Sequence, residues 1–148
     1  MIITYVQDDG TEERYTTDDL SALEAAAIEE AMGDTPWRFI EDQLRGQRPT
    51  AMRAVLWVFR RRTEPKLEFS EFDVPGWKRR MRCRIERFEI DDILDNLVQT
   101  ALANNEDASI NAMLPHLYSL AQNRADVDAA LDALGKGHLA AGREDSAA

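Results

Sequence analysis

Residues 49–62 read PTAMRAVLWVFRRR, and this stretch predicts a helix with a long apolar face. Pro49 and Thr50 suit a helix start, because proline at the first helical position has a favourable φ and lacks an N–H that would be unbonded there. The inner face recurs at helical spacing and consists of Met52, Val55, Leu56 and Phe59. Trp57 lies to one side of that face, near the arginines.

Upstream of this helix, the first 17 residues predict a β-hairpin. Its strand-forming residues flank Asp8-Asp9-Gly10, a turn sequence that uses the tolerance of glycine for positive φ. A lone hairpin is only marginally stable in water, so we expect it to pack on helices or to pair with another strand.

Two further helices are predicted between the hairpin and residue 49. The first spans residues 18–32, and Thr17, Asp18 and Ser21 are its candidate caps, of which Ser21 has capping-box spacing to Glu24. Its apolar face consists of Leu20, Leu23, Ala27, Ile28 and Ala31. The second begins at Thr35-Pro36 and ends at Gly46.

Downstream, residues 63–76 predict a loop that runs extended over the helices. In residues 77–90, apolar Met81, Cys83 and Ile85 alternate with Arg82 and Arg84, which indicates a strand with one solvated face; a basic helix is the alternative. Residues 93–134 predict amphipathic helices that end at Gly135, with Pro115 starting or kinking one of them.

These patterns predict a mainly α fold of the α+β class. An N-terminal β-hairpin precedes a bundle of five or six helices, with one extra strand allowed near 78–88. We expect a single globular domain over 1–136, with a sub-boundary allowed near 75–90, and a disordered tail over 137–148.

Composition and charge exclude several classes of protein. The chain of 148 residues has one cysteine, which rules out an internal disulfide framework. It has no apolar run of membrane-spanning length and no recognisable signal peptide, so we expect no membrane association. The net charge of −10 argues against nucleic-acid binding.

That charge is unevenly distributed along the sequence. Residues 1–50 carry a net −8, residues 51–90 a net +5 and residues 91–148 a net −7. The basic middle segment either neutralises its acidic neighbours within the fold or presents a basic surface to an acidic partner.

No catalytic constellation is present in the sequence. His116, His138 and Cys83 give no metal-ligand spacing, and the seven glycines form no phosphate-binding loop. Adjacent carboxylates such as Asp91-Asp92 point apart on a helix. We therefore predict no catalytic residues, no metal and no cofactor, and a protein that is not an enzyme.

Two groups of residues are candidates for binding a partner. The first comprises Trp57, Phe59, Arg60, Arg61 and Arg62, and the second comprises Arg80, Arg82 and Arg84. Each has a structural alternative, since tryptophans are usually largely buried and cations suit a helix C-terminus. Self-association is a further possibility, through addition of the hairpin to the sheet edge of a neighbouring copy.

The stretch Leu20–Val74, together with Asp19 before it, carries a series of residues that resembles a known family. In order they are Asp19-Leu20, Glu24, Ile28-Glu29, Gly33, Trp37, Met52-Arg53-Ala54-Val55-Leu56-Trp57, Arg60-Arg61, Pro65 and Phe69. This series resembles the tail assembly chaperones of long-tailed, siphovirus-type bacteriophages. Its motifs are packing motifs, and it covers about 55 of the 148 residues.

The resemblance implies a non-catalytic role in viral tail assembly. Such chaperones bind the long helical tape measure protein in the host cytoplasm, keep it soluble, help to recruit tail tube protein and are absent from the mature virion. The family often makes a second, longer product by ribosomal frameshifting near the end of the short form, and the codons of Leu134-Gly135-Lys136 can contain a slippery heptamer. The alternative reading is a small acidic regulator that mimics DNA and binds a host nucleic-acid-binding protein.

Overall fold

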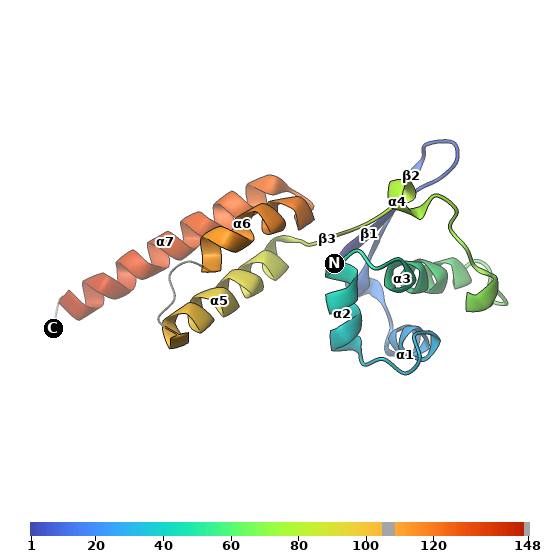
Figure 1. The fold of residues 1–148 in the computed structure, drawn as a ribbon, viewed down its shortest axis with the longest axis horizontal. Helices are drawn as coiled ribbons and strands as arrows, with labels where there is room; N and C mark the ends of the chain where they lie inside the picture. Colours follow the sequence, from blue (N-terminus) through green and yellow to red (C-terminus); the bar gives the residue numbers. More distant parts are fainter. Residues whose placement is uncertain (105–108, 147–148) are drawn as a thin grey trace. The chain divides into compact units, whose positions relative to one another are not determined.

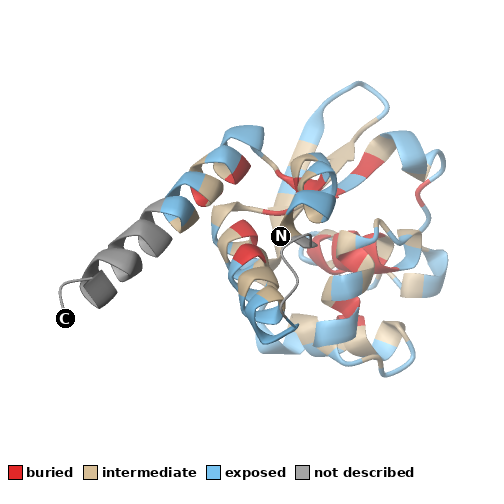
Figure 2. Ribbon diagram, turned by 60° about the vertical axis from the view of Figure 1, so that its left-hand side comes forward, coloured by how far each residue is buried: buried red, intermediate tan, exposed pale blue. Residues whose placement is uncertain are grey.

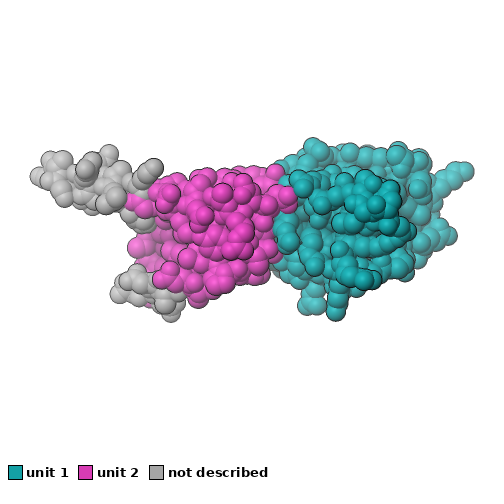
Figure 3. All heavy atoms as spheres, turned by 90° about the horizontal axis from the view of Figure 1, so that it is seen from above, with its two compact units in different colours: residues 1–84 teal, residues 85–148 magenta. Residues whose placement is uncertain are grey.

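A computed structural model describes the backbone of residues 1–104 and 109–146, and the side chains of residues 1–104 and 110–135. The chain divides into two compact units, residues 1–84 and residues 85–148 (Figure 3). The fold is α+β with an N-terminal hairpin, as the sequence predicts. Each unit is described by itself below.

Unit 1 contains a small sheet and four helices (Figure 1). The strands are β1 (Ile2–Val6), β2 (Glu12–Thr16) and β3 (Met81–Arg84), and the helices are α1 (Ala22–Ala31), α2 (Trp37–Arg45), α3 (Pro49–Arg61) and the single turn α4 (Trp77–Arg80). Short 3-10 turns occur at Thr17–Asp19 and Phe69–Glu71.

The sheet is antiparallel, in the order β2-β1-β3. Gly10 turns the hairpin with a φ of 86°, a conformation that glycine adopts without steric cost. Ile3 lies opposite Tyr15 on one side and Cys83 on the other. The predicted hairpin and the strand near 78–88 are both confirmed, and they pair with each other.

The core of unit 1 surrounds α3, which is buried on almost every side. Its buried residues are Ala51, Met52, Ala54, Val55, Leu56, Trp57, Val58 and Phe59. Figure 2 shows buried positions concentrated on this helix and on the sheet. The four-residue inner face predicted for this helix includes only half of its buried residues. The buried surface is wider because α1, α2 and the sheet all pack on α3.

The loop after α3 is fixed to that helix by hydrogen bonds. Arg53 donates from Nη1 to the carbonyl oxygens of Phe69 and Phe72 at 2.7 and 2.6 Å, and its guanidinium lies 3.8 Å from the centre of the Phe69 ring. Trp57 donates from Nε1 to the carbonyl oxygen of Leu67 at 2.9 Å. Residues 63–76 therefore lie along α3, as expected.

Unit 2 is helical in its described residues, with α5 (Arg87–Asn104), α6 (Ser109–Leu120) and α7 (Arg124–Ser146). Among the described side chains, each helix buries two apolar residues: Ile90 and Leu94 in α5, Leu117 and Leu120 in α6, and Val127 and Ala130 in α7. Pro115 lies inside α6. An isolated parallel bridge joins Ile85 to Ala121.

The prediction that the last helix ends at Gly135 is wrong, because α7 continues to Ser146. A glycine ends a helix only when it turns into the left-handed conformation, and inside a helix it costs about 1 kcal/mol relative to alanine. Alanines at 140 and 141 favour continuation. Most of the segment 137–148 is thus helical, while residues 147 and 148 lie outside the described residues.

Candidate partner-binding pocket

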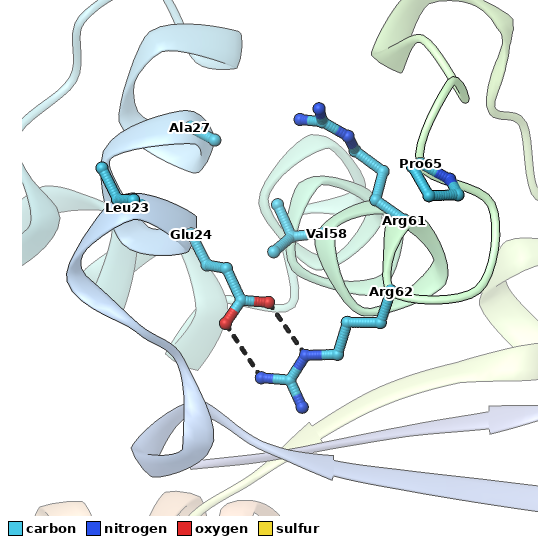
Figure 4. A pocket seen from close by; sticks show the side chains of 7 residues that line it. All are labelled: Leu23, Glu24, Ala27, Val58, Arg61, Arg62 and Pro65. Carbon is cyan, nitrogen blue, oxygen red and sulfur yellow. Dashed lines mark hydrogen bonds and ion pairs between the residues drawn. The ribbon is translucent and has the colours of Figure 1, made fainter.

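An apolar pocket lies between α1 and the C-terminal end of α3 in unit 1 (Figure 4). It has a volume of about 320 Å³. The residues that line it are Leu23, Glu24, Ala27, Val58, Arg61, Arg62 and Pro65. Val58 forms part of its floor, and Leu23 lies on the opposite wall.

The start of α1 places Leu23 and Glu24 at this pocket. Ser21 caps the helix: its Oγ accepts the Glu24 N–H at 3.1 Å, and Glu24 Oε1 accepts the Ser21 N–H at 3.0 Å. This capping box satisfies two backbone donors that a helix end would otherwise leave unbonded. Of the three candidate caps, Ser21 is the one that caps the helix, and it places Leu23 and Glu24 in the first turn.

Leu23 is 85% exposed, which contradicts its predicted place on the inner face of this helix. The helix begins at Ala22, later than predicted, so Leu23 belongs to its first turn. The buried residue of this helix is Ile28. A large apolar side chain that stays exposed beside an apolar pocket is a feature of binding surfaces.

A bidentate ion pair closes one side of the pocket. Arg62 donates from Nε to Glu24 Oε2 and from Nη2 to Glu24 Oε1, each at 2.9 Å, as the dashed lines in Figure 4 show. Nη2 also donates to the carbonyl oxygen of Asp19 at 2.8 Å. The hydrogen bonds from Arg62, aided by the Ser21 N–H, lower the pKa of Glu24 to about 2.

Arg61 lies on the other wall, and within the described residues no carboxylate forms an ion pair with it. The guanidinium of Arg61 lies 5.0 Å from the centre of the Trp57 ring, a cation–π geometry that leaves its hydrogen-bond donors open to a partner. Pro65 lies beside Arg61 in Figure 4. The pocket thus combines an apolar floor with one available positive charge at its rim.

The aromatic candidates from the sequence do not form an open surface. Trp57 and Phe59 are each 6% exposed. Phe59 stacks on Tyr15 with ring centres 4.7 Å apart, and Trp57 packs against Phe69 at 5.3 Å. Both side chains therefore contribute mainly to the core of unit 1.

The arginine candidates are divided among different sites. Arg61 and Arg62 line the pocket, whereas Arg60 bonds Glu13 at 3.1 Å. In the second group, Arg80 forms an ion pair with Asp8, Arg82 is exposed and Arg84 is half-buried. Neither Arg60 nor any member of this second group lines the pocket.

Sequence reasoning missed most of the apolar wall of the pocket. Ala27 and Val58 looked like ordinary helix residues, and Pro65 looked like part of a loop. Their proximity depends on how α1 packs against α3, which no local pattern encodes. One feature of the sequence could have indicated that Leu23 is exposed: it lies two residues after the cap Ser21, in the first turn of the helix.

A second hollow, of about 580 Å³, occurs in unit 2 between α5 and α7. Its lining mixes apolar side chains, including Val98 and Leu134, with the carboxylates of Asp91 and Asp95. Arg87 bonds Asp91 at 3.0 Å. This hollow is more polar than the α1–α3 pocket.

Within the described residues, no group of three or more His, Cys, Asp or Glu side chains is arranged to hold a metal ion. Cys83, the single cysteine of the sequence, is buried on β3. None of the described helices is both long enough and apolar enough to cross a membrane.

No protein-family model matches the chain, and neither a curated protein nor a solved structure matches it.

Proposed function

We propose that this protein is a tail assembly chaperone of a long-tailed, siphovirus-type bacteriophage. In this role it binds the tape measure protein and keeps it soluble during tail assembly, without catalysing a reaction. The proposal rests on the resemblance over residues 20–74 and on one structural observation. Glu24, Arg61 and Pro65 belong to the resembling series, and all three line the α1–α3 pocket.

The pocket suits one face of an amphipathic helix. Such helices bind by inserting apolar side chains, spaced three or four residues apart, into a hydrophobic groove. Leu23 and Val58 would contact those side chains, and Arg61 would meet an acidic residue at their flank. A tape measure protein is long and helical, so it offers many segments of this kind.

A chaperone of this type would act in the host cytoplasm and be absent from the mature virion. A frameshifted longer form would add the contact to the tail tube protein. The first 84 residues, which hold the pocket, would be common to both forms if the slip occurred near Leu134.

The proposal is tested by co-expressing the full chain with the tape measure protein of the same genome, followed by tagged capture and light scattering. We expect a soluble complex with several copies of this chain per tape measure protein, where tape measure protein alone precipitates. Insoluble, uncaptured tape measure protein in the presence of this chain would refute the proposal.

The acidic regulator remains a second candidate because of unit 2. Residues 85–148 contain 4 Lys or Arg and 12 Asp or Glu, a net charge of −8. Two of those carboxylates, Asp91 and Asp95, lie beside the hollow of unit 2. A DNA mimic would bind host DNA-binding proteins in a salt-sensitive manner and would displace DNA from them.

A further inference from the structure

The two edges of the sheet in unit 1 differ in whether their outward backbone groups are hydrogen-bonded. In the order β2-β1-β3, both β2 and β3 are edge strands. The outward N–H and C=O groups of an edge strand can pair with another strand, and proteins often block them. The state of each edge therefore indicates whether another strand can bind there.

The β3 edge is closed by a side chain. Gln47 donates from Nε2 to the carbonyl oxygen of Cys83 at 2.8 Å, and the Cys83 N–H donates to Gln47 Oε1 at 2.9 Å. The carboxamide thereby makes the two bonds that a neighbouring strand would make. A further strand cannot pair with β3 at this position unless Gln47 leaves.

The backbone of Gln47 is strained in the conformation that permits this contact. Its φ is 56°, in the left-handed region that favours glycine. The Arg48 N–H bonds the Gln43 carbonyl at 2.9 Å and the Gln47 N–H bonds the Leu44 carbonyl at 3.0 Å, a helix ending in which glycine usually stands at this position. Glycine would adopt this conformation without strain, but it has no side chain to bond the backbone of Cys83.

The β2 edge has no such cover. The Gln7 N–H bonds the Thr11 carbonyl and the Thr17 N–H bonds the Met1 carbonyl, so the bonded pairs of the hairpin fall on odd-numbered residues. The backbone groups of Glu12 and Arg14 therefore point away from β1. Within the part of the chain that the structure describes, no group hydrogen-bonds them.

The side chains on the β2 edge are complementary in charge to the same side chains on a second copy of the chain. Glu12 and Arg14 form an ion pair of 2.7 Å on the strand, and their side chains are 43% and 63% exposed. If a second β2 ran antiparallel with its Glu12 opposite Arg14, the pairing would occur twice around a two-fold axis. Opposite charges directly across a strand pair are stabilising.

The opposite face of β2 can also accommodate a second copy. In this register the two Glu13 side chains meet, but each already accepts a hydrogen bond from Arg60 of its own chain at 3.1 Å. A hollow of about 370 Å³ adjoins the strand on this side. Its lining includes Glu13, Tyr15, Phe59 and Arg60, so it offers both room and positive charge to an incoming carboxylate.

We infer that β2 is a self-association edge: two copies of the chain pair antiparallel through β2, with Glu12 of each opposite Arg14 of the other. This inference does not depend on the proposed chaperone function.

Exchange of the two charges provides the test, with the full chain and its mass of 16.8 kDa as the reference. In sedimentation experiments we expect wild type to reach twice that mass as its concentration rises. Glu12→Arg and Arg14→Glu should each remain monomeric, because each places like charges opposite one another. An equimolar mixture of the two variants should regain the dimer as a heterodimer.

Backbone hydrogen exchange gives a second readout on wild type. The amides of Glu12 and Arg14 should become protected as concentration rises, whereas the amide of Cys83, already bonded to Gln47, should not change. Wild type that stays monomeric, single variants that still dimerise, or a mixture that stays monomeric would each overturn the inference. Unchanged unfolding midpoints would show that the variants are folded.

Discussion

The two units of the chain bury apolar residues in different ways. In unit 1 a single helix, α3, is buried on nearly every side, and eight of its residues are buried. Among the described side chains of unit 2, each of the three helices has two buried residues. In unit 1 many buried residues pack around one central helix. In unit 2 the buried residues are distributed over three helices, with fewer on each.

The units also differ in charge. Residues 1–84 contain 14 Lys or Arg and 16 Asp or Glu, a net −2, against the net −8 of residues 85–148. Unit 1 uses its arginines internally, on carbonyl oxygens, aromatic rings and carboxylates. Most of the net negative charge of the chain is thus carried by unit 2.

The largest effect should come from opening a cavity beside the central helix. Leu56→Ala should lower the free energy of unfolding by about 4–5 kcal/mol, near the upper end for such changes, because packing on all sides prevents collapse around the gap. Leu94→Ala in α5 should cost only about 2–3 kcal/mol, since the helices of unit 2 can close over the gap. Denaturant titration measures both, and equal losses would contradict the contrast.

Replacing the proline of α6 should strengthen unit 2. Pro115→Ala restores a helical N–H and removes a clash with the preceding turn, and the gain should reach about 3 kcal/mol at most. Hydrogen exchange should slow in α6 while α3 is unaffected. Faster exchange in α6 would mean that the proline is required for packing.

Sequence patterns predicted well those features that depend on local spacing. The hairpin turn at Gly10, the Ser21 cap and the alternation of Met81, Cys83 and Ile85 each record a local backbone preference, and each is confirmed. Helical continuation through Gly135 was not predicted, because glycine permits a helix end without requiring one.

The pocket could not be predicted from spacing because it depends on contacts between distant residues. Arg62 looked like a free cation in the sequence, but Glu24, 38 positions earlier, binds it. Gln47 lies 36 positions from Cys83, so its closure of the β3 edge is equally invisible in the sequence. Only the packing of α1 and α2 on α3 brings these groups together.

A smaller effect is expected from the cap of α1. Ser21→Ala removes the hydrogen bond to the Glu24 N–H and should cost about 1 kcal/mol of stability. Ser119→Ala in α6 is a matched change in unit 2, where the hydroxyl bonds a carbonyl oxygen within its own helix and should matter less. Thermal unfolding of both variants provides the comparison, and an equal loss would contradict a special role for the cap.

The smallest effect should be the pH dependence of the Glu24–Arg62 pair. The pKa of Glu24 is lowered to about 2 in the folded protein from 4.5, so its stabilisation is complete above pH 4.5. That contribution, of order 1 kcal/mol or less for so exposed a pair, is lost as the pH falls from 4.5 towards 2. Glu24→Gln should remove this part of the acid dependence, and an unchanged profile would show that the pair contributes nothing.

We propose that unit 1 binds the tape measure protein through the pocket beside Leu23. Leu23 and Leu102 form a matched pair for testing it, since they are 85% and 72% exposed and lie in different units. The decisive measurement is the yield of soluble tape measure protein co-expressed with wild type, Leu23→Glu or Leu102→Glu. We predict normal yields with wild type and Leu102→Glu and a loss with Leu23→Glu; a normal yield with Leu23→Glu, or a loss confined to Leu102→Glu, would contradict the claim.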